Sequence, residues 1–320
     1  MEMKSEYSFI GEIENPSIYN ITLSQEQLNA VNEIILNDLS RHPAEAILKR
    51  KDPATYGQIP YTLLKTSSQN YFLMGWRQRN GNENAFFGRG INCKCVKGAV
   101  LLRKADNYII SNEIYAIKIV EEPKNIIVRD KLTHEKEIFK EVYGFGELIH
   151  RNNKYYLIMP KMPGILISKL DYAHMSIEEL INLLCSIFGA LSMLHAKGIF
   201  HQDFKIDNLI YDGKSNTTYL IDFEFSAKEP KLQFRYDLSD SVQAATDVIN
   251  EYAKAHSIPK EECGGVYWNI KKVICQLFDL PLKKMKGVDD PIYKNVRALF
   301  ENALEPISSR TKSNDPIFNL

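Results

Sequence analysis

The sequence predicts an α+β fold built from a β-rich half and a helical half. Short runs rich in β-branched and aromatic residues, punctuated by Asn, Gly and Ser, lie between residues 61 and 120, which is typical of a sheet. After Met159 apolar residues recur at helical spacing, and residues 159–164 join the two patterns. The length of 320 residues suits one large two-lobed domain or two domains.

The composition excludes several classes of protein. Lys and Arg number 40 against 40 Asp and Glu, and 44% of residues are apolar, which is typical of a soluble globular protein. Without a basic excess, nucleic acid is not an expected partner. Five scattered cysteines favour reduced thiols over a disulfide framework or a zinc site. We expect a soluble, cytoplasmic protein without a Sec-type signal peptide or a transmembrane segment, because polar residues interrupt the apolar run 180–196.

In the first half, helix signals come before the strands. Ser24 followed by Gln27 is a capping-box pattern, and it predicts an amphipathic helix over 24–39. A second short helix is predicted over 43–50. The remaining predicted elements are strands over 61–65, 71–76, 96–103 and 114–120, a helix over 135–141, and a hairpin over 147–159 that turns at 151–154.

Helical patterns dominate the second half. Ser176 with Glu179 is another capping box, and the apolar residues from Leu180 to Leu194 form one helix face. Three more helices are predicted over 238–252, 266–278 and 292–304.

The strongest chemical signal is the segment His201-Gln202-Asp203-Phe204-Lys205-Ile206-Asp207-Asn208, followed by Ile221-Asp222-Phe223-Glu224. Phosphoryl transfer needs carboxylate, amide and cationic groups around a triphosphate whose charge must be neutralised. The two segments resemble the catalytic loop and the metal-binding segment of protein kinases. The resemblance implies a bilobal protein-kinase-like fold that binds ATP with Mg²⁺ or Mn²⁺ and phosphorylates an alcohol group.

The resemblance also implies a role for each of these residues. Asp203 would orient the attacking hydroxyl and Lys205 would contact the γ-phosphate. The divalent metal would be held by Asn208 and Asp222, with Glu224 as a further candidate. The alternative interpretation is that both aspartates cap turns and that the lysine is a solvated surface charge.

A second match lies upstream, in Tyr115-Ala116-Ile117-Lys118, which resembles the kinase strand whose lysine binds the α- and β-phosphates. In the family a helix glutamate holds that lysine. We favour Glu135, which is followed by an apolar pair at helical spacing. Glu137 and Glu141 remain alternatives because the phase of the helix is open.

The nucleotide would meet two further segments. Gly88 and Gly90 resemble the first glycines of the kinase phosphate loop, although Cys93 replaces the third. The hinge would include Met159, with Pro160 supplying a carbonyl and Met162 an N–H to adenine. Because Gly88 lies 30 positions before Lys118, the hairpin between them is expected to carry extra residues around 106–112.

The sequence departs from the family pattern at three places. Gln202 replaces an arginine that would pair with a phosphorylated activation loop. Asp237 follows Asp222 by only 15 positions, so the usual peptide-docking platform is expected to be missing. Glu224 replaces a glycine, which predicts a fixed loop and a preference for manganese.

These departures are similar to those of kinases that intracellular bacteria such as Legionella translocate into host cells. We therefore predict a divergent protein Ser/Thr kinase of that effector type, with a protein substrate and secretion independent of a Sec signal. The alternative is a small-molecule or lipid kinase, because the Ile221–Glu224 string also resembles choline kinases and aminoglycoside phosphotransferases. A pseudokinase binding module is the second alternative.

Two predictions concern organisation and regulation. The domains are expected to be an extension over 1–80, a kinase-like N-lobe over 81–161 and a C-lobe over 162–320. Activation by an inositol phosphate or a phosphoinositide would use Lys271, Lys272, Lys283, Lys284 and Lys286. Residues 261–320 carry nine basic against eight acidic groups, so a solvated helix face is the other interpretation.

Overall fold

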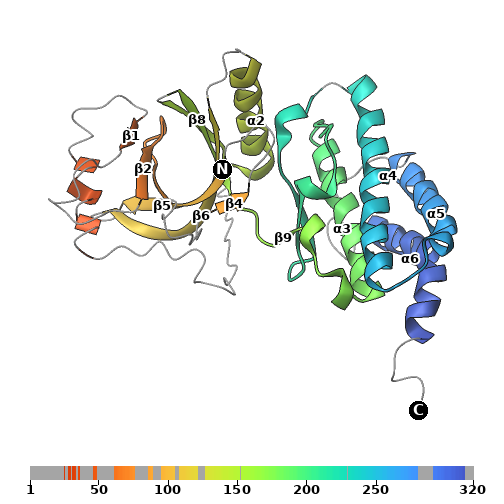
Figure 1. Cartoon of the computed structure of the whole chain (residues 1–320). Coiled ribbons are helices and arrows are strands. Elements are labelled where there is room, and N and C mark those ends of the chain that lie inside the picture. The colour runs from red at the N-terminus through yellow and green to blue at the C-terminus, as the bar shows by residue number, and fades with distance from the viewer. Residues whose placement is uncertain are drawn as a thin grey trace. The chain divides into compact units, whose positions relative to one another are not determined.

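The computed structural model divides the chain into two compact units, Met1–Lys161 and Met162–Leu320 (Figure 1). The boundary lies in the 159–164 segment, where the sequence pattern changes. The structure describes residues 25, 28–29, 31–33, 35–36, 46–48, 61–75, 86–88, 95–104, 108–121, 127–151, 153–228, 230–279 and 291–313.

The first unit is built on an antiparallel sheet with the strand order β1-β2-β3-β5-β6-β8-β7, while β4 also pairs with β5. Its strands are β1 (Ala46–Leu48), β2 (Tyr61–Lys65), β3 (Tyr71–Gly75), β4 (Phe86–Gly88), β5 (Cys95–Lys104), β6 (Tyr108–Glu121), β7 (Glu147–Arg151) and β8 (Lys154–Pro160). The predicted strands and the predicted hairpin are confirmed. The described residues of the predicted 24–39 helix are also helical, with Val31 and Ile35 buried.

The short helix predicted over 43–50 is wrong for the part that the structure describes. Ala46–Leu48 is strand β1, which pairs antiparallel with β2, Ala46 opposite Lys65. Pairing with β2 satisfies backbone groups that would otherwise lie at a sheet edge, and such tertiary pairing overrides a local helix preference. Strands β1 to β3, which we assigned to the extension, therefore belong to the same sheet as the predicted N-lobe strands.

The extra residues between Gly88 and Lys118 lengthen a hairpin. β5 has 10 residues and β6 has 14, and they stay paired out to Lys104 opposite Tyr108. The pairing register shifts between Val100 and Leu102, which marks a bulge. Residues 108–112, which were expected to be inserted, are the first part of strand β6.

Helix α2 (Ile127–Tyr143) packs on strands β7 and β8 (Figure 1). One face of the sheet buries an apolar core of Leu64, Phe72, Met74, Tyr115, Ile117, Ile119, Ile149, Tyr156 and Ile158. A second cluster places Leu132 of α2 against Val120, Tyr155 and Leu157. These apolar contacts therefore fix the position of α2 against β6, the strand that carries Lys118.

The second unit is mainly helical. Its helices are α3 (Ile177–His195), α4 (Pro230–Ala255), α5 (Lys260–Asp279) and α6 (Pro291–Ser313), and its small sheet has the order β11-β10-β9. These strands are β9 (Ile165–Leu166), β10 (Leu209–Asp212) and β11 (Thr217–Leu220). All four predicted helices are confirmed, and with the sheet of the first unit they confirm the predicted α+β class.

Helix α3 is the one described helix that is long and apolar enough to cross a membrane. Its residues are mostly buried within the unit, as in the core helix of a globular domain, and its N-terminus is closed by the predicted capping box of Ser176 and Glu179. Among the cysteines whose side chains the structure describes, Cys185, Cys263 and Cys275 form no disulfide bond.

Candidate active site

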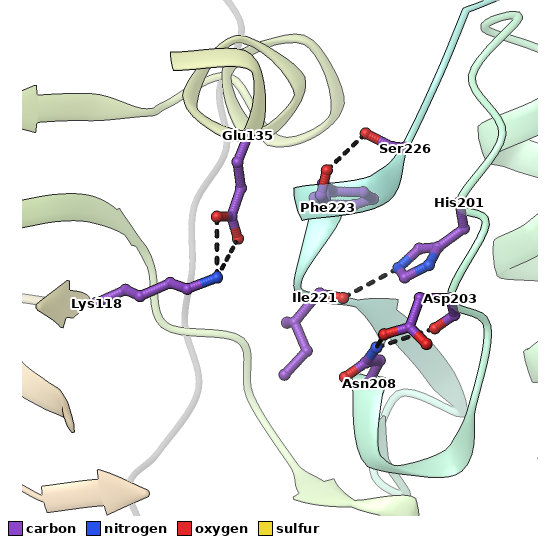
Figure 2. Close-up of polar contacts among 8 residues, drawn as sticks. All are labelled: Lys118, Glu135, His201, Asp203, Asn208, Ile221, Phe223 and Ser226. Atoms are coloured by element: carbon purple, nitrogen blue, oxygen red, sulfur yellow. Dashed lines mark hydrogen bonds and ion pairs between the residues drawn. The ribbon is translucent and has the colours of Figure 1, made fainter. Parts of the chain in front are cut away.

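Lys118 of β6 and Glu135 of α2 form a buried ion pair in the first unit (Figure 2). Lys118 Nζ lies 3.0 Å from Glu135 Oε2 and 3.2 Å from Oε1. Glu135 is fully buried, because α2 turns the face of Glu135, Ile138 and Phe139 toward the sheet. Of the three glutamates considered, Glu135 is therefore the one that contacts Lys118.

The two alternatives lie on other faces of the helix. Glu137 is mostly exposed and pairs with Lys136 at 2.7 Å, and Glu141 is exposed. The buried pair differs from such surface pairs, because each buried charge would be costly without the other. A lysine held in this way presents a fixed positive charge.

In the second unit, Asp237 of α4 holds the backbone of the 201–208 loop. Its carboxylate accepts hydrogen bonds from His201 N–H at 2.9 Å and Gln202 N–H at 2.7 Å. It also contacts His195 Nε2 at 2.7 Å, and Asp237 is fully buried. Gln202 has a positive φ of 60°, a conformation uncommon for a residue other than glycine. Asp237 therefore stabilises a loop with a strained backbone.

Asp203, Lys205 and Asn208 are brought together by this loop. Lys205 Nζ donates to Asp203 Oδ2 at 2.7 Å, and Asn208 Nδ2 donates to the same oxygen at 2.9 Å. The Asp203 and Lys205 side chains are partly exposed, whereas Asn208 is buried. The carboxylate is thus held by two donors while it still faces solvent.

His201 links this loop to the segment that carries Asp222. Its Nε2 lies 3.0 Å from the carbonyl oxygen of Ile221 (Figure 2). Ile221 N–H also donates to Asn208 O at 3.0 Å. Burial lowers the pKa of His201, and the nearby carboxylates of Asp237, Asp203 and Asp222 only oppose that effect. The imidazole is therefore neutral, and its hydrogen bond to the Ile221 carbonyl oxygen connects the two segments.

The segment after Asp222 is short and tightly bonded. Asp222 has φ 62°, and a 3-10 turn over Phe223–Phe225 follows, in which Ser226 N–H and Oγ both donate to Phe223 O (Figure 2). Phe200 and Ala227 then exchange two backbone hydrogen bonds of 2.8 and 2.9 Å. Glu224 is not among the residues with positive φ, so its backbone does not require glycine.

The oxygen atoms of this region suit a hard divalent cation. Asn208 uses its Nδ2 on Asp203, which leaves Oδ1 as an acceptor. Asn208 and Asp222 together offer amide and carboxylate oxygens, the ligands that Mg²⁺ and Mn²⁺ prefer. Within the described residues no three His, Cys, Asp or Glu side chains cluster as a metal site. Such a donor set fits a cation that takes its other ligands from phosphate and water.

The remaining predicted site residues are spread over both units. Gly88 ends strand β4, and Gly90 lies outside the described residues. In the hinge segment, Met159 faces Ala116 in the β8–β6 register, Pro160 ends β8, and Met162 is buried.

Of the five lysines proposed for a polyanion, Lys271 and Lys272 lie on α5, each 5.7 Å from the centre of the exposed Trp268 ring. Lys283, Lys284 and Lys286 lie outside the described residues.

One acidic residue of this region was missed. Asp240 of α4 is half-buried, and burial together with the negative charges of Asp237 and Asp203 raises the pKa of its carboxyl group. It lies three residues after Asp237, and side chains at that spacing share a helix face. That spacing from the loop-binding aspartate is the signal that could have identified Asp240.

Comparison with known proteins finds a family match over the part of the chain that carries these contacts. Residues 97–255, close to half of the chain, match the protein kinase domain. The match includes β6, α2, the 201–208 loop and α4, which carry every contact described for Lys118, Asp203 and Asp237. It confirms the predicted kinase-like fold.

Similar proteins include protein kinases of animals and plants. The chain is 28% identical over 129 residues to the human hormonally up-regulated neu tumor-associated kinase, covering 37% of this chain and 18% of that protein. It is 24% identical over 185 residues to a MAP kinase-interacting serine/threonine-protein kinase of Caenorhabditis elegans, covering 55% of this chain and 24% of that protein. It is 26% identical over 207 residues to calcium-dependent protein kinase 11 of Arabidopsis thaliana, covering 63% of this chain and 37% of that protein. The chain thus spans well under half the length of these relatives.

Proposed function

Because residues 97–255 match the protein kinase domain, we propose that the protein transfers the γ-phosphoryl group of ATP to a hydroxyl, with protein serine or threonine as the favoured acceptor. The observation that carries the proposal is the 201–208 loop. It holds Asp203, Lys205 and Asn208 in mutual contact on a backbone anchored by Asp237. The charged residues proposed to act in phosphoryl transfer, Lys118, Asp203, Lys205 and Asp222, are all present, which argues against a pseudokinase.

Each residue then has a task that its surroundings support. Asp203 would accept or orient the proton of the acceptor hydroxyl, since its carboxylate is partly exposed and held by two donors. Lys205 would stabilise charge on the γ-phosphoryl group and Lys118 charge on the α- and β-phosphates. Glu135 would position Lys118.

ATP and a divalent metal complete the proposed chemistry. A bound Mg²⁺ or Mn²⁺ would neutralise phosphate charge, and Asn208 and Asp222 would hold it, with Glu224 as a third candidate. Gly88 and Gly90 would bring backbone N–H groups to the phosphates. Met159, Pro160 and Met162 would contact adenine.

We propose that activity does not depend on phosphorylation of an activation loop. Helix α4 begins at Pro230, so only residues 223–229 separate it from Asp222, and the Phe200–Ala227 bridge ties that segment down. Gln202 also lacks the charge that would bind a phosphate. A loop of this kind supports the proposed effector-type kinase, acting in the cytoplasm of a host cell.

The same short segment favours a second candidate function. With seven residues before α4, little chain is left to form a platform for an extended peptide. A small-molecule or lipid kinase similar to choline kinases or aminoglycoside phosphotransferases needs no such platform. The acceptor assay must therefore include both classes of substrate.

The decisive experiment incubates the protein with γ-labelled ATP, Mg²⁺ or Mn²⁺, and fractions of eukaryotic lysate. Label on a polypeptide supports the protein kinase, and label only on small alcohols or lipids supports the second candidate. A parallel reaction with α-labelled ATP separates phosphoryl transfer from transfer of AMP.

Two variants of the loop control this assay. Asp203→Ala should lower turnover by about a thousandfold or more, because it removes the group that orients the acceptor. Asp207→Ala changes an exposed aspartate of the same loop and should keep turnover within about twofold. Equal activity of wild type and Asp203→Ala would refute the site assignment.

The metal preference has its own test. A carboxylate at position 224 beside the metal would favour Mn²⁺ over Mg²⁺, so the Mn²⁺/Mg²⁺ ratio of turnover should fall in Glu224→Ala. An unchanged ratio would remove Glu224 from the site.

We also propose that α5 binds a polyanion, with Lys271 and Lys272 as the described part of the site and Lys283, Lys284 and Lys286 as the rest. Support comes from Trp268, which is 58% exposed and flanked by both ammonium groups. Inositol hexakisphosphate should raise kinase activity, and Lys271→Ala/Lys272→Ala should weaken that response. Lys254→Ala, on α4, is the control, and an equal response in all three proteins would contradict the site.

A further inference from the structure

The connecting segment 144–147, which joins helix α2 to strand β7, packs against the turn of α2 that carries Glu135. Gly144 follows the last helical residue and has a positive φ of 79°, a conformation that commonly ends a helix. A Cβ added at Gly146 would collide with the carbonyl oxygen of Lys136, so the two backbones are in direct contact. Because Lys136 follows Glu135 in the chain, the position of the connecting segment is coupled to the position of Glu135.

The hairpin of strands β2 and β3 also binds the connecting segment. Asn70 Nδ2, in the hairpin turn, donates to Oε1 of the buried Glu147 at 3.0 Å. The Phe145 ring packs on Phe72 of β3, with the ring centres 6.0 Å apart, and on Tyr115 of β6 at 4.9 Å. The connecting segment is therefore held by a hydrogen bond and by aromatic contacts in addition to its contact with α2.

Backbone hydrogen bonds fix the turn that presents Asn70. Thr66 N–H donates to Asn70 O at 3.0 Å, and Asn70 N–H donates to Thr66 Oγ1 at 3.2 Å. Gln69 N–H also donates to Thr66 O at 3.0 Å. These bonds use the backbone of Asn70, whereas the bond to Glu147 uses its side chain. A substitution of that side chain should therefore leave the turn intact.

The hydrogen bond from Asn70 has a charged acceptor. Hydrogen bonds to a carboxylate are stronger than those between neutral groups, and a buried acceptor that loses its donor is costly. The hairpin lies before residue 97, where the family match begins. A part of the chain outside that match thus contacts the segment that follows α2.

We propose that Asn70 is a positioning residue, which through Glu147 fixes the connecting segment against α2 and so keeps Glu135 on Lys118 (Figure 2). The contacts themselves are a property of the folded first unit. Their effect on ATP affinity rests on the proposed function, in which Lys118 binds the α- and β-phosphates.

Asn70→Ala removes the side-chain donor and keeps the backbone bonds of the turn. Hydrogen exchange in α2 and β7, measured by mass spectrometry without nucleotide, should become about tenfold faster while exchange in β5 stays unchanged. Ser68→Ala, at an exposed position of the same turn, is the matched control and should leave all three elements unchanged. Equal acceleration in β5 and α2 would overturn the inference, because Asn70 would then contribute only to general stability.

A reciprocal exchange of the two side chains tests the pair directly. Asn70→Asp places a carboxylate against Glu147 and should speed exchange in α2 at least as much as the alanine variant. Asn70→Asp/Glu147→Gln restores one donor and one acceptor in reversed order and should return most of the wild-type protection. This comparison decides the question if the alanine variant does not fold, and absence of rescue would overturn the inference.

Steady-state kinetics separates positioning from stability. If Lys118 is less well placed, ATP binds more weakly, so Asn70→Ala should raise KM for ATP by about three- to tenfold with kcat within about twofold. A partly unfolded variant would instead lose active enzyme, which lowers kcat at an unchanged KM. An unchanged KM would overturn the positioning role.

Failure of the proposed function would be recognised separately. Wild-type protein without kinase activity would refute that function, while the exchange measurements, which need no turnover, would still support or overturn the placement of α2 by Asn70.

Discussion

At the scale of single residues, His201 is a buried titratable group that folding keeps neutral. Its Nε2 faces a carbonyl oxygen, which can only accept, so Nε2 carries the proton. Its buried Nδ1 has no hydrogen-bond partner among the described residues. Protonation of this ring would bury a positive charge. It would also add an N–H at Nδ1, which has no hydrogen-bond acceptor among the described residues.

This predicts a pH dependence of stability. In the unfolded chain the pKa of His201 is about 6.5, and burial lowers it in the folded protein. Below about pH 6.5 the unfolded state binds more protons, so stability present at neutral pH is lost as pH falls toward the folded value, at up to about 1.4 kcal/mol per pH unit. Urea unfolding between about pH 7.5 and 5 measures it, without divalent metal.

Two variants define the source of that slope. His201→Gln keeps an N–H donor but does not titrate near neutrality, so its stability should depend less on pH. His174→Gln changes an exposed histidine that pairs with Asp171 and should keep most of the wild-type slope. If the free energy of unfolding depends on pH equally in wild type and His201→Gln, the prediction is wrong.

The Lys118–Glu135 pair makes a second prediction at this scale. Lys118→Met removes the ammonium group that pairs with the buried Glu135 carboxylate and should destabilise the protein by about 3–5 kcal/mol. The double variant Lys118→Met/Glu135→Met should recover most of that loss, because it removes both charges. Urea unfolding measures the three proteins.

Surface charges give the control. Lys136→Met breaks the more exposed pair with Glu137 and should cost about 1 kcal/mol or less. If the double variant is as unstable as Lys118→Met, the loss of stability in Lys118→Met does not come from the buried charge of Glu135.

The site residues differ in how far the sequence could identify them. The type and spacing of Asp203, Lys205 and Asn208 indicated one loop, and the structure shows their contacts. The partner of Lys118 was ambiguous because three glutamates within seven residues fit a helix of unknown phase, and only packing against the sheet selects Glu135. Asp240 was missed because only its spacing from Asp237 marks it in the sequence, and its partial burial is seen only in the folded protein.

At the scale of elements, helices with caps and apolar stripes were predictable, as α3 shows with its capping box. Strand β1 was not, because three residues become a strand only through pairing with β2. The ends of α2 were also missed, since the predicted 135–141 helix covers only the apolar turn of Ile127–Tyr143. Pairing and packing, rather than local preference, decide these cases.

Helix α5 carries two interior glycines that predict a stabilising change. Gly264 and Gly265 are exposed, and an added Cβ would meet nothing within 4 Å at either position. Each substitution by alanine should raise the free energy of unfolding by about 0.5–1 kcal/mol, because alanine loses less backbone entropy in a helix. Thermal and urea unfolding check the single and double variants.

Another glycine gives the opposite sign as a control. A Cβ at Gly146 would lie 2.4 Å from the carbonyl oxygen of Lys136 in α2, so Gly146→Ala should destabilise the protein. Destabilisation by Gly264→Ala would show that α5 needs its glycines for a contact beyond the described residues.

At the scale of the whole molecule, the first unit depends on residues that lie far apart in sequence. Leu64, Phe72 and Met74 of β2 and β3 pack with Tyr115, Ile117 and Ile158 in one core. Asn70 Nδ2 also donates to Glu147 Oε1 at 3.0 Å, across 77 residues of sequence. The family match begins only at residue 97, so sequence similarity alone would leave these strands outside the domain that they complete.

This organisation predicts that a destabilising substitution in β3 also destabilises the elements that carry the Lys118–Glu135 ion pair. Phe72 is fully buried, with its ring 5.0 Å from that of Tyr115, and Tyr115 precedes Lys118 on β6. Phe72→Ala should cost about 3–5 kcal/mol and speed hydrogen exchange in β6, α2 and β8 as well as in β3. Leu36→Ala, at a position that is 63% exposed, should change neither. Faster exchange confined to residues 61–75 would instead show that the first three strands unfold separately from the strand that carries Lys118.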